Sequence, residues 1–167
     1  MAETAWDLLE PLLLEWLERA NHNRHQHYGA SVMLSILNYV LGILASVLSA
    51  SVVVFRLGQP EGTQTWPRIV VFFAAGMSGL QTFLNLGRKA ETHRLTATGY
   101  AAMRRRLEET MALPVSLRGE PKAVVDEIRA SLDSLAKSAP SVPGMLRREE
   151  REEPIFGQYA KFRGQRP

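Results

Sequence analysis

The chain has 167 residues, of which 46% are hydrophobic and 22% are charged, and its formal net charge is +3. It contains no cysteine, which excludes disulfide bonds, thiolate metal sites and cysteine nucleophiles. The charge is segregated, because nearly all of it lies before residue 25 or after residue 87. Such a mild basic balance suits a protein beside anionic lipid headgroups as well as one that binds nucleic acid.

The first expected element is an amphipathic helix within residues 1–28, starting near Pro11 and ending at about His27. Pro11 is expected in its first turn, where the missing N–H costs least. The helix either lies on a membrane surface or packs against a cytosolic part of the same protein. The acidic start of the chain does not resemble a cleaved signal peptide, so we expect the first span to act as its own insertion signal. The apolar residues at helical spacing are Trp6, Leu9, Leu13, Trp16, Leu17 and Ala20.

Two charge-free apolar runs follow, at Tyr28–Phe55 and Ile69–Gly87. Each is long enough to cross a bilayer core of about 30 Å at a helical rise of roughly 1.5 Å per residue. We therefore expect transmembrane helices at residues 29–55 and 69–87. Residues 56–68 are too few for a folded module and predict the external loop of a helical hairpin, with turn residues at Gly58, Pro60 and Gly62.

Basic residues flank the predicted hairpin on its two outer sides, while the loop has only Arg56 and Arg68. The positive-inside rule then places both termini in the cytoplasm. The basic residues outside the hairpin are Arg19, Arg24, Arg88, Lys89, Arg94 and the run Arg104 to Arg106.

Small residues at four-residue spacing predict close helix packing within the spans. Gly42 lies on such a stripe in the first span, and Ala75 and Gly79 form one in the second. These three residues are the predicted helix-packing positions.

Polar residues form a seam along the two predicted spans. Amides inside a membrane are expensive when they face lipid and usually face protein or water. The seam therefore either makes static interhelical hydrogen bonds or lines an aqueous path, and the second role needs an oligomer because two helices cannot enclose a channel. Its members are Asn38, Ser46, Ser78, Gln81 and Asn85.

Residues 88–139 are expected to form a cytosolic helical stem and a return helix. No strong helix breaker lies between Gly87 and Pro114, so the second span should continue as a straight stem. After the break, an amphipathic helix from Lys122 to about Ser138 is expected to fold back on the stem. Residues 140–167 alternate Pro, Gly and dense charge, which predicts a flexible tail. The inward stripe of the stem is Ala90, His93, Ala97, Tyr100, Met103 or Arg104, Leu107 and Met111.

Histidines and arginines supply the remaining candidate sites. His93 and Tyr100 lie two turns apart and either hydrogen-bond within the stem bundle, bind a phosphate-bearing ligand or respond to pH. Arg104, Arg105 and Arg106 cannot all face one way; they form a solvated face balanced by nearby glutamates or contact an anion, either a nucleotide or a partner protein. His22, His25 and His27 lack the i,i+4 spacing of a helical metal site, and we expect them to be solvated near headgroups.

Motifs for enzymatic chemistry are absent from the sequence: it has no Gly-rich phosphate loop, HExxH, GxSxG or clustered carboxylate pair. We therefore expect no catalytic residues, no metal and no cofactor. The basic residues follow the membrane flanks rather than an aromatic-studded surface, so nucleic acid is not an expected partner.

Three segments, in their order around the hairpin, resemble the SLATT family. They are the run from Glu15 to Ala30 before the first span, the stem sequence from Ala90 to Tyr100, and the closing run from Leu132 to Pro143. The resemblance covers residues 10–146, and within the stem it rests on His93, Arg94, Ala97 and Tyr100.

This resemblance implies a bacterial two-transmembrane effector domain, of a family associated with nucleotide-second-messenger synthetases and related sensors in antiviral conflict systems. The implied activity is to oligomerise and breach the inner membrane in an abortive-infection response. The chain has no nucleotide-synthesising domain, so the signal is expected from a separate upstream synthetase or sensor protein, or from a ligand bound to the helical part. The alternatives are a membrane-anchored scaffold or adaptor, whose spans only tether the cytosolic bundle, and a constitutive ion channel.

Overall fold

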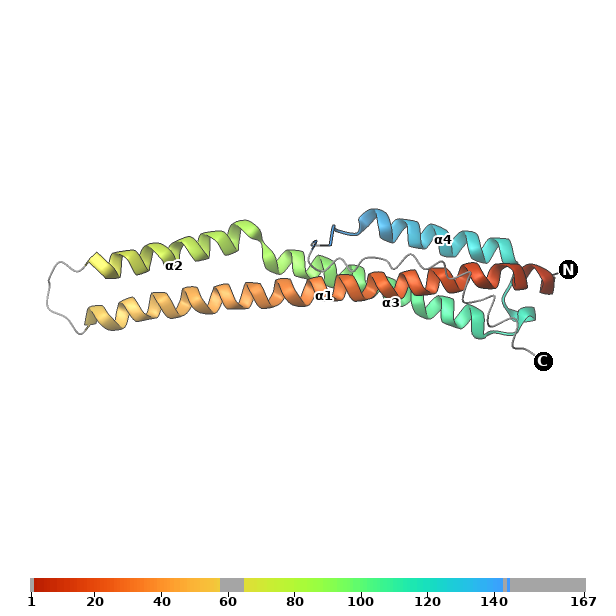
Figure 1. Cartoon of the computed structure of the whole chain (residues 1–167), viewed down its shortest axis with the longest axis horizontal. Coiled ribbons are helices and arrows are strands. Elements are labelled where there is room, and N and C mark those ends of the chain that lie inside the picture. The colour runs from red at the N-terminus through yellow and green to blue at the C-terminus, as the bar shows by residue number, and fades with distance from the viewer. Residues whose placement is uncertain (1, 58–64, 143, 145–167) are drawn as a thin grey trace. The chain divides into compact units, whose positions relative to one another are not determined.

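Helices account for all of the regular structure in the described part of the chain. The computed structural model describes residues 2–57, 65–142 and 144. The elements are α1 (Ala2–Leu57), α2 (Thr65–Leu84), α3 (Leu86–Ala112), a 3-10 turn η1 (Val115–Leu117) and α4 (Pro121–Ser138) (Figure 1). No strand occurs among these residues, so the all-α class predicted from sequence is confirmed.

The chain divides into two compact units. Unit 1 comprises Met1–Ala30 and His93–Pro167, and unit 2 comprises Ser31–Thr92. The divisions fall inside α1 and α3, close to the boundaries expected at 28/29 and 87/88. The predicted loop at 56–68 is shorter, since α1 extends to Leu57 and α2 begins at Thr65; its turn residues and nearly all of the predicted tail lie outside the described residues.

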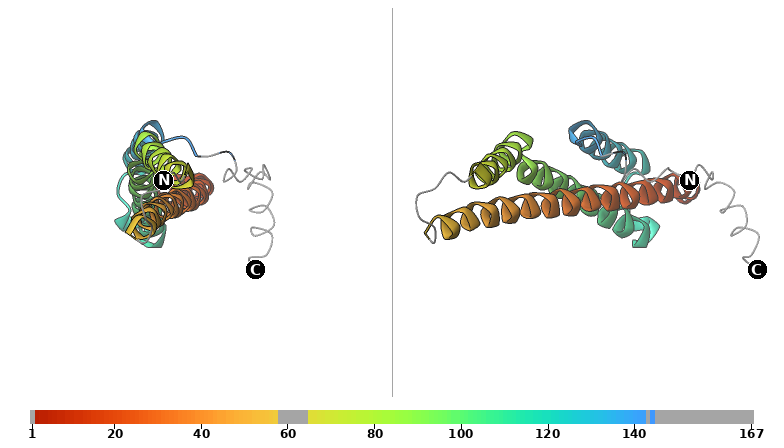
Figure 2. Two further views of the ribbon diagram at one scale, coloured as in Figure 1. Left: turned by 90° about the vertical axis from the view of Figure 1, so that its left-hand side faces the viewer. Right: turned by 60° about the vertical axis from the view of Figure 1, so that its left-hand side comes forward.

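Unit 1 is organised around a core to which α1, α3 and α4 all contribute side chains. Figure 2 gives two further views of the ribbons of these helices. Trp6 and Leu13 come from α1, Leu107 from α3 and Ile128 from α4, and all four side chains are fully buried. Helix α4 begins at Pro121, a residue suited to the first helical turn, and packs on α3 as predicted for the return helix. The inward stripe of the stem is also confirmed, with six buried members and one half-buried one: Ala90, His93, Ala97, Tyr100, Met103, Leu107 and, half-buried, Met111.

The first helix differs from its prediction in where it begins. It starts at Ala2, and Pro11 lies inside it rather than in the first turn. Proline removes one intrahelical hydrogen bond there, but the buried side chains of Trp6 and Leu13 hold the helix on both sides of it. Of the two arrangements expected for this segment, the structure has the packed helix and not a free surface helix.

The stem after Gly87 is one helix, α3, as predicted, but the second span does not continue straight into it, because the helix breaks within the second apolar run. Asn85 has a φ of 47°, the left-handed conformation, and separates α2 from α3. Asparagine adopts this conformation more readily than most residues with a Cβ. The backbone hydrogen bonds on either side persist, from Asn85 N–H to the Gln81 carbonyl and from Lys89 N–H to the Asn85 carbonyl, each at 3.1 Å.

Substitutions at Asn85 test whether the left-handed residue sets the bend. Asn85→Gly is expected to keep it, while Asn85→Leu, which pays about 1 kcal/mol or more in this conformation, should shift α2 and α3 towards one straight helix. Spin labels on Val71 and Arg88, both exposed, measure this, since a straight helix separates their Cα atoms by roughly 26 Å. If the unsubstituted chain, Asn85→Gly and Asn85→Leu all have equal label distances and equal thermal stability, Asn85 does not set the bend.

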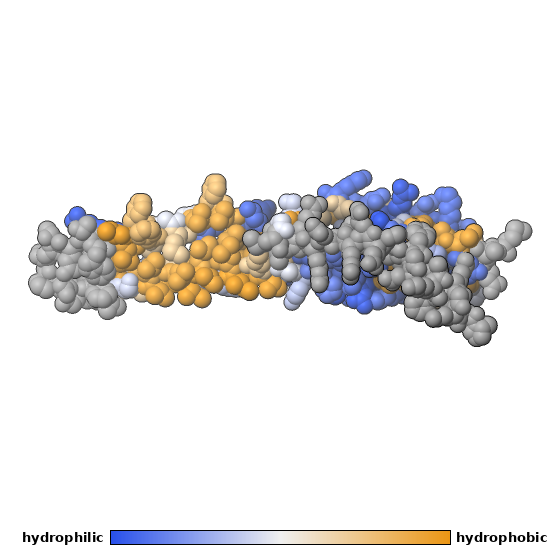
Figure 3. All heavy atoms as spheres, viewed as in Figure 1, coloured by the Kyte–Doolittle hydropathy of each residue, from blue (hydrophilic) through white to orange (hydrophobic). Residues whose placement is uncertain are grey.

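Unit 2 leaves most of its apolar surface uncovered. Its core cluster is small and consists of Leu34, Leu86 and Ala90, with a few half-buried neighbours. Two segments, Ala5–Val53 and Arg68–Ala112, contain a stretch long and apolar enough to cross a membrane, and only 11% of each stretch is buried. In the core helix of a water-soluble protein most of such a stretch would be covered. The space-filling view shows hydrophobic residues gathered over α2 and the later part of α1 (Figure 3).

Candidate functional site

A polar contact between Gln81 and Asn38 joins α1 and α2 within unit 2. The Nε2 amide of Gln81 donates to the backbone carbonyl of Asn38 at 3.2 Å and to its Oδ1 at 3.0 Å. One turn further along α1, a Cβ added to Gly42 would lie 3.3 Å from the Gln81 Nε2 atom. The absence of a side chain at Gly42 thus makes room for the Gln81 amide, and the pairing of Asn38 with Gln81 is an interhelical hydrogen bond of the static kind.

The other members of the predicted seam do not join this contact. Ser46, Ser78 and Asn85 are exposed in the chain. The hydroxyl of Ser46 donates to the carbonyl of Gly42 in its own helix at 2.8 Å. Their assignment as pore-lining residues stays a prediction.

The predicted packing pair of α2 is exposed as well. A Cβ on Gly79 would meet nothing within 4 Å, and Ala75 is exposed, whereas its neighbour Ala74 is buried. The pair therefore mediates no close helix contact in the described part of the chain. Helix packing at Ala75 and Gly79, as predicted, would then require contact with a second chain.

A buried histidine pair lies in unit 1, between α1 and α3. The Nδ1 atoms of His27 and His93 are 2.9 Å apart, and these residues are 5% and 4% exposed. The ring of Tyr100, also buried, stacks on His27 with a centroid separation of 5.9 Å and an interplanar angle of 13°. A hydrogen bond between two Nδ1 atoms requires one ring to donate and the other to accept, so the neutral pair consists of opposite tautomers.

The surroundings of the pair favour its uncharged form. Burial lowers the pKa of both His27 and His93, and the charge of His93 lowers the pKa of His27 further. Burial raises the pKa of the Tyr100 hydroxyl, an effect that a hydrogen bond with Asn23 opposes. At neutral pH the three rings are therefore uncharged.

His27 was expected to be solvated, and that expectation is wrong. The i,i+4 rule used for the histidines tests for metal sites and says nothing about packing. A seven-residue spacing carries the missing signal, because the residues on this stripe of α1 are all buried: Trp6, Leu13, Ala20, His27 and Leu34. His93, Tyr100 and Leu107 repeat the same spacing on α3.

The remaining stem residues have structural roles or lie at the surface. Ala97 is buried one turn after His93, while Arg94 and Arg105 are exposed. Arg104 pairs with Glu108 at 2.7 Å, and Arg106 pairs with Glu127 of α4 at 2.8 Å. Two of the three predicted arginines thus form the balanced, solvated face rather than an anion site, with Glu127 as a partner that sequence reasoning missed.

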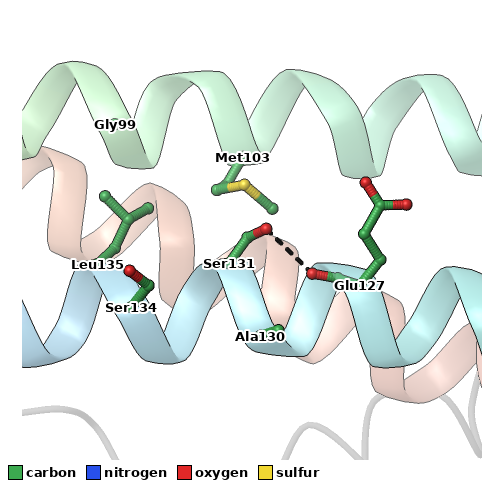
Figure 4. Close-up of a pocket in the computed structure, with 7 residues that line it drawn as sticks. All are labelled: Gly99, Met103, Glu127, Ala130, Ser131, Ser134 and Leu135. Carbon is green, nitrogen blue, oxygen red and sulfur yellow. Dashed lines mark hydrogen bonds between the residues drawn. The ribbon is translucent and has the colours of Figure 1, made fainter.

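A shallow groove lies between α3 and α4 in unit 1 (Figure 4). A Cβ at Gly99 would lie 2.5 Å from Leu135 Cδ2, so the absence of a side chain at Gly99 makes room for Leu135 of α4. The Ser131 hydroxyl donates to the Glu127 carbonyl at 3.0 Å within α4. Small and apolar side chains dominate the groove, which is a packing seam between two helices.

No family model, curated protein or solved structure matches this chain. Among the described residues, no group of three or more His, Cys, Asp or Glu side chains is placed to hold a metal ion. The functional inference therefore depends on two features, the uncovered apolar surface of unit 2 and the polar contacts inside the two units.

Proposed function

We propose that the chain is an integral membrane protein of the bacterial inner membrane, in which unit 2 crosses the bilayer as a two-helix hairpin with both termini in the cytoplasm. The observation that carries this proposal is the exposure of large apolar side chains on both α1 and α2. Exposed apolar surface is unfavourable in water at about 25 cal/mol per Å², whereas the same surface is expected in lipid. On the two helices it includes Ile36, Tyr39, Ile43, Val47, Val53, Ile69, Phe72, Phe73, Leu80 and Phe83.

The polar contact of unit 2 supports a membrane setting. Amides in hydrocarbon need a protein partner, and Gln81 has one in Asn38. The hydroxyls of Ser46 and Thr82 donate to carbonyls four residues earlier in their own helices, at 2.8 and 2.9 Å. These polar side chains therefore have protein partners without water.

We further propose that the protein is an effector of bacterial antiviral immunity, which oligomerises and forms a pore or disrupts the membrane on receiving a signal. The resemblance to SLATT proteins supplies this activity. Two features of α2 are consistent with an oligomer: Ser78 is exposed, and the small pair Ala75 and Gly79 has no close neighbour in the described part of its own chain.

Induced expression in a bacterium, together with a membrane-impermeant dye, tests the effector activity. The protein is induced in two conditions, alone and together with its upstream signal protein. If it is an effector, the dye enters the cells in at least one of them. A tether inserts into the membrane and admits none. If no dye enters under either condition while the protein is in the membrane fraction, the effector proposal is wrong.

A variant that combines Gln81→Leu with Asn85→Gly separates pore lining from packing. It removes both amides but keeps the left-handed conformation at position 85, which glycine adopts freely. If the seam lines a pore, dye entry is lost while membrane insertion persists. Thr82→Leu is the matched control, since Thr82 is exposed on the same helix and its hydroxyl bonds its own helix. Unchanged dye entry in the double variant refutes the pore-lining role.

The second candidate function is a membrane-anchored scaffold or adaptor. The contact between Asn38 and Gln81 favours it, because an amide already bonded within one chain is not free to line an aqueous path. The complete core of unit 1 is also compatible with a cytosolic bundle that only needs a tether. Membrane insertion without dye entry is the result expected for this function.

A further inference from the structure

The histidine pair of unit 1 joins two helices that are far apart in sequence. His27 belongs to α1 and His93 to α3, and both residues are almost fully buried. We propose that this pair is a proton-operated latch, which holds α1 against α3 while at most one imidazole is charged and releases them when both are. The proposal concerns unit 1 alone and does not depend on the proposed membrane activity.

Counting protons shows why the contact survives the first added proton. In the neutral pair, one Nδ1–H donates to the other Nδ1, and the accepting ring carries its own proton on Nε2. The first added proton can bind Nε2 of the donating ring, which leaves the Nδ1–H···Nδ1 hydrogen bond in place. The resulting imidazolium is then still bonded to a neutral partner.

The second added proton breaks the contact. The only free basic atom left is the accepting Nδ1, which lies 2.9 Å from the donating one. Protonation there turns two N–H groups towards each other and places two positive charges in a buried site. The repulsion is large because the charges are close together and no solvent screens them. Relief requires the rings, and so the two helices, to move apart.

In the described part of the chain, no carboxylate is one of the groups that shift the pKa of either histidine. Tyr100 stacks on His27, and Arg24 of α1 is directed to Asn21 and His25. Glu91 and Arg94 follow the exposed side of α3, and Lys137, near the end of α4, is exposed. Among the described residues, His93 is the only charged group that shifts the pKa of His27, and no charged group shifts that of His93.

The direction of the pH effect follows from these shifts. Burial holds the pKa of both imidazoles below the ordinary value of 6.5, so the open bundle binds more protons than the closed one. The stability contributed by the pair is fully present above that value and is lost as the pH falls through the lowered pKa values.

The test uses the full chain in lipid nanodiscs with spin labels on introduced cysteines at Glu18 of α1 and Ala102 of α3. Both positions are exposed in unit 1, and the chain has no cysteine of its own. Lowering the pH from about 8 to about 5 is expected to shift the label distance reversibly to longer values. A distance that stays constant across this range overturns the proposal.

Histidine variants assign the response to the pair. His93→Gln is expected to abolish the pH-dependent shift, whereas His25→Gln, a change at an exposed histidine of the same helix as His27, leaves it intact. Loss of the shift in His25→Gln with its retention in His93→Gln overturns the latch.

Imidazole NMR titration of the unsubstituted chain gives a second readout that needs no variant to fold. His27 and His93 are expected to titrate below the ordinary range, in separate steps. Four ordinary titrations would overturn the latch in the same way.

Discussion

Replacing Phe73 and Leu80 of α2 together by arginine is expected to remove the chain from the membrane fraction. These side chains are 61% and 49% exposed in the chain, so they face lipid if unit 2 spans a bilayer. An arginine near the middle of a transmembrane helix costs about 2.5 to 3.5 kcal/mol on insertion, so the pair costs roughly 5 to 7 kcal/mol. Fractionation after an alkaline wash measures the result.

The chain offers a matched control for this experiment in unit 1. Leu95 and Leu117 are also large, apolar and exposed, but they lie outside both predicted spans. Replacing them by arginine should leave the protein in the membrane fraction. If the α2 variant is retained as well as this control, the exposed face of α2 does not contact lipid and the membrane proposal fails.

Replacing Trp6 by alanine is expected to destabilise unit 1 by about 3 to 5 kcal/mol, the usual cost of removing a large aromatic side chain from a core. Trp6 is 1% exposed and packs in the cluster that contains Leu13 and Ile128. The guanidinium of Arg118 also lies over its ring, 5.5 Å from the centroid. Heat unfolding followed by the helical circular dichroism signal, with the full chain in detergent, measures the loss.

Leu8→Ala is the control for Trp6→Ala, since Leu8 lies in the same helix and is 77% exposed. It should change the unfolding temperature little. A similarly small effect of both substitutions would mean that the first helix contributes no core side chains to unit 1. The same outcome would revive a membrane-surface position for its tryptophan.

Patterns that extend over several turns predicted the fold well. The stem stripe from Ala90 to Met111 follows from periodicity, because a buried helix face must repeat every three to four residues. The return helix is marked by Pro121 at its start and by apolar residues such as Ile128. Both features arise from the chain's own sequence and need no knowledge of distant contacts.

Local exceptions to those patterns could not be predicted. Local rules tolerate Pro11 in a first turn but not inside a helix, and only the burial of Trp6 and Leu13 on either side explains why the helix continues through it. Asn85 is polar but not a strong breaker, so nothing in its neighbours predicts a left-handed conformation. In both cases the outcome depends on packing between segments that are remote in sequence.

The candidate sites divide in the same way. Sequence reasoning selected both Asn38 and Gln81 but could not pair them, since periodicity identifies a face and not its partner. It selected His93 and assigned it a partner in the bundle, yet it missed that His27 is that partner. A search for seven-residue repeats along the whole of α1 would have placed His27 on the buried face, although not against His93.

The bend at Asn85 has a consequence for motion. The N–H of Asn85 donates to the Gln81 carbonyl and the Asn85 carbonyl accepts from the Lys89 N–H, so both main-chain groups of the left-handed residue keep a partner. The bend can thus act as a hinge between α2 and α3. Rotating the torsions of one residue by an amount that costs on the order of 1 kcal/mol would realign two helices, a change small enough for a bound ligand or neighbouring subunit to drive.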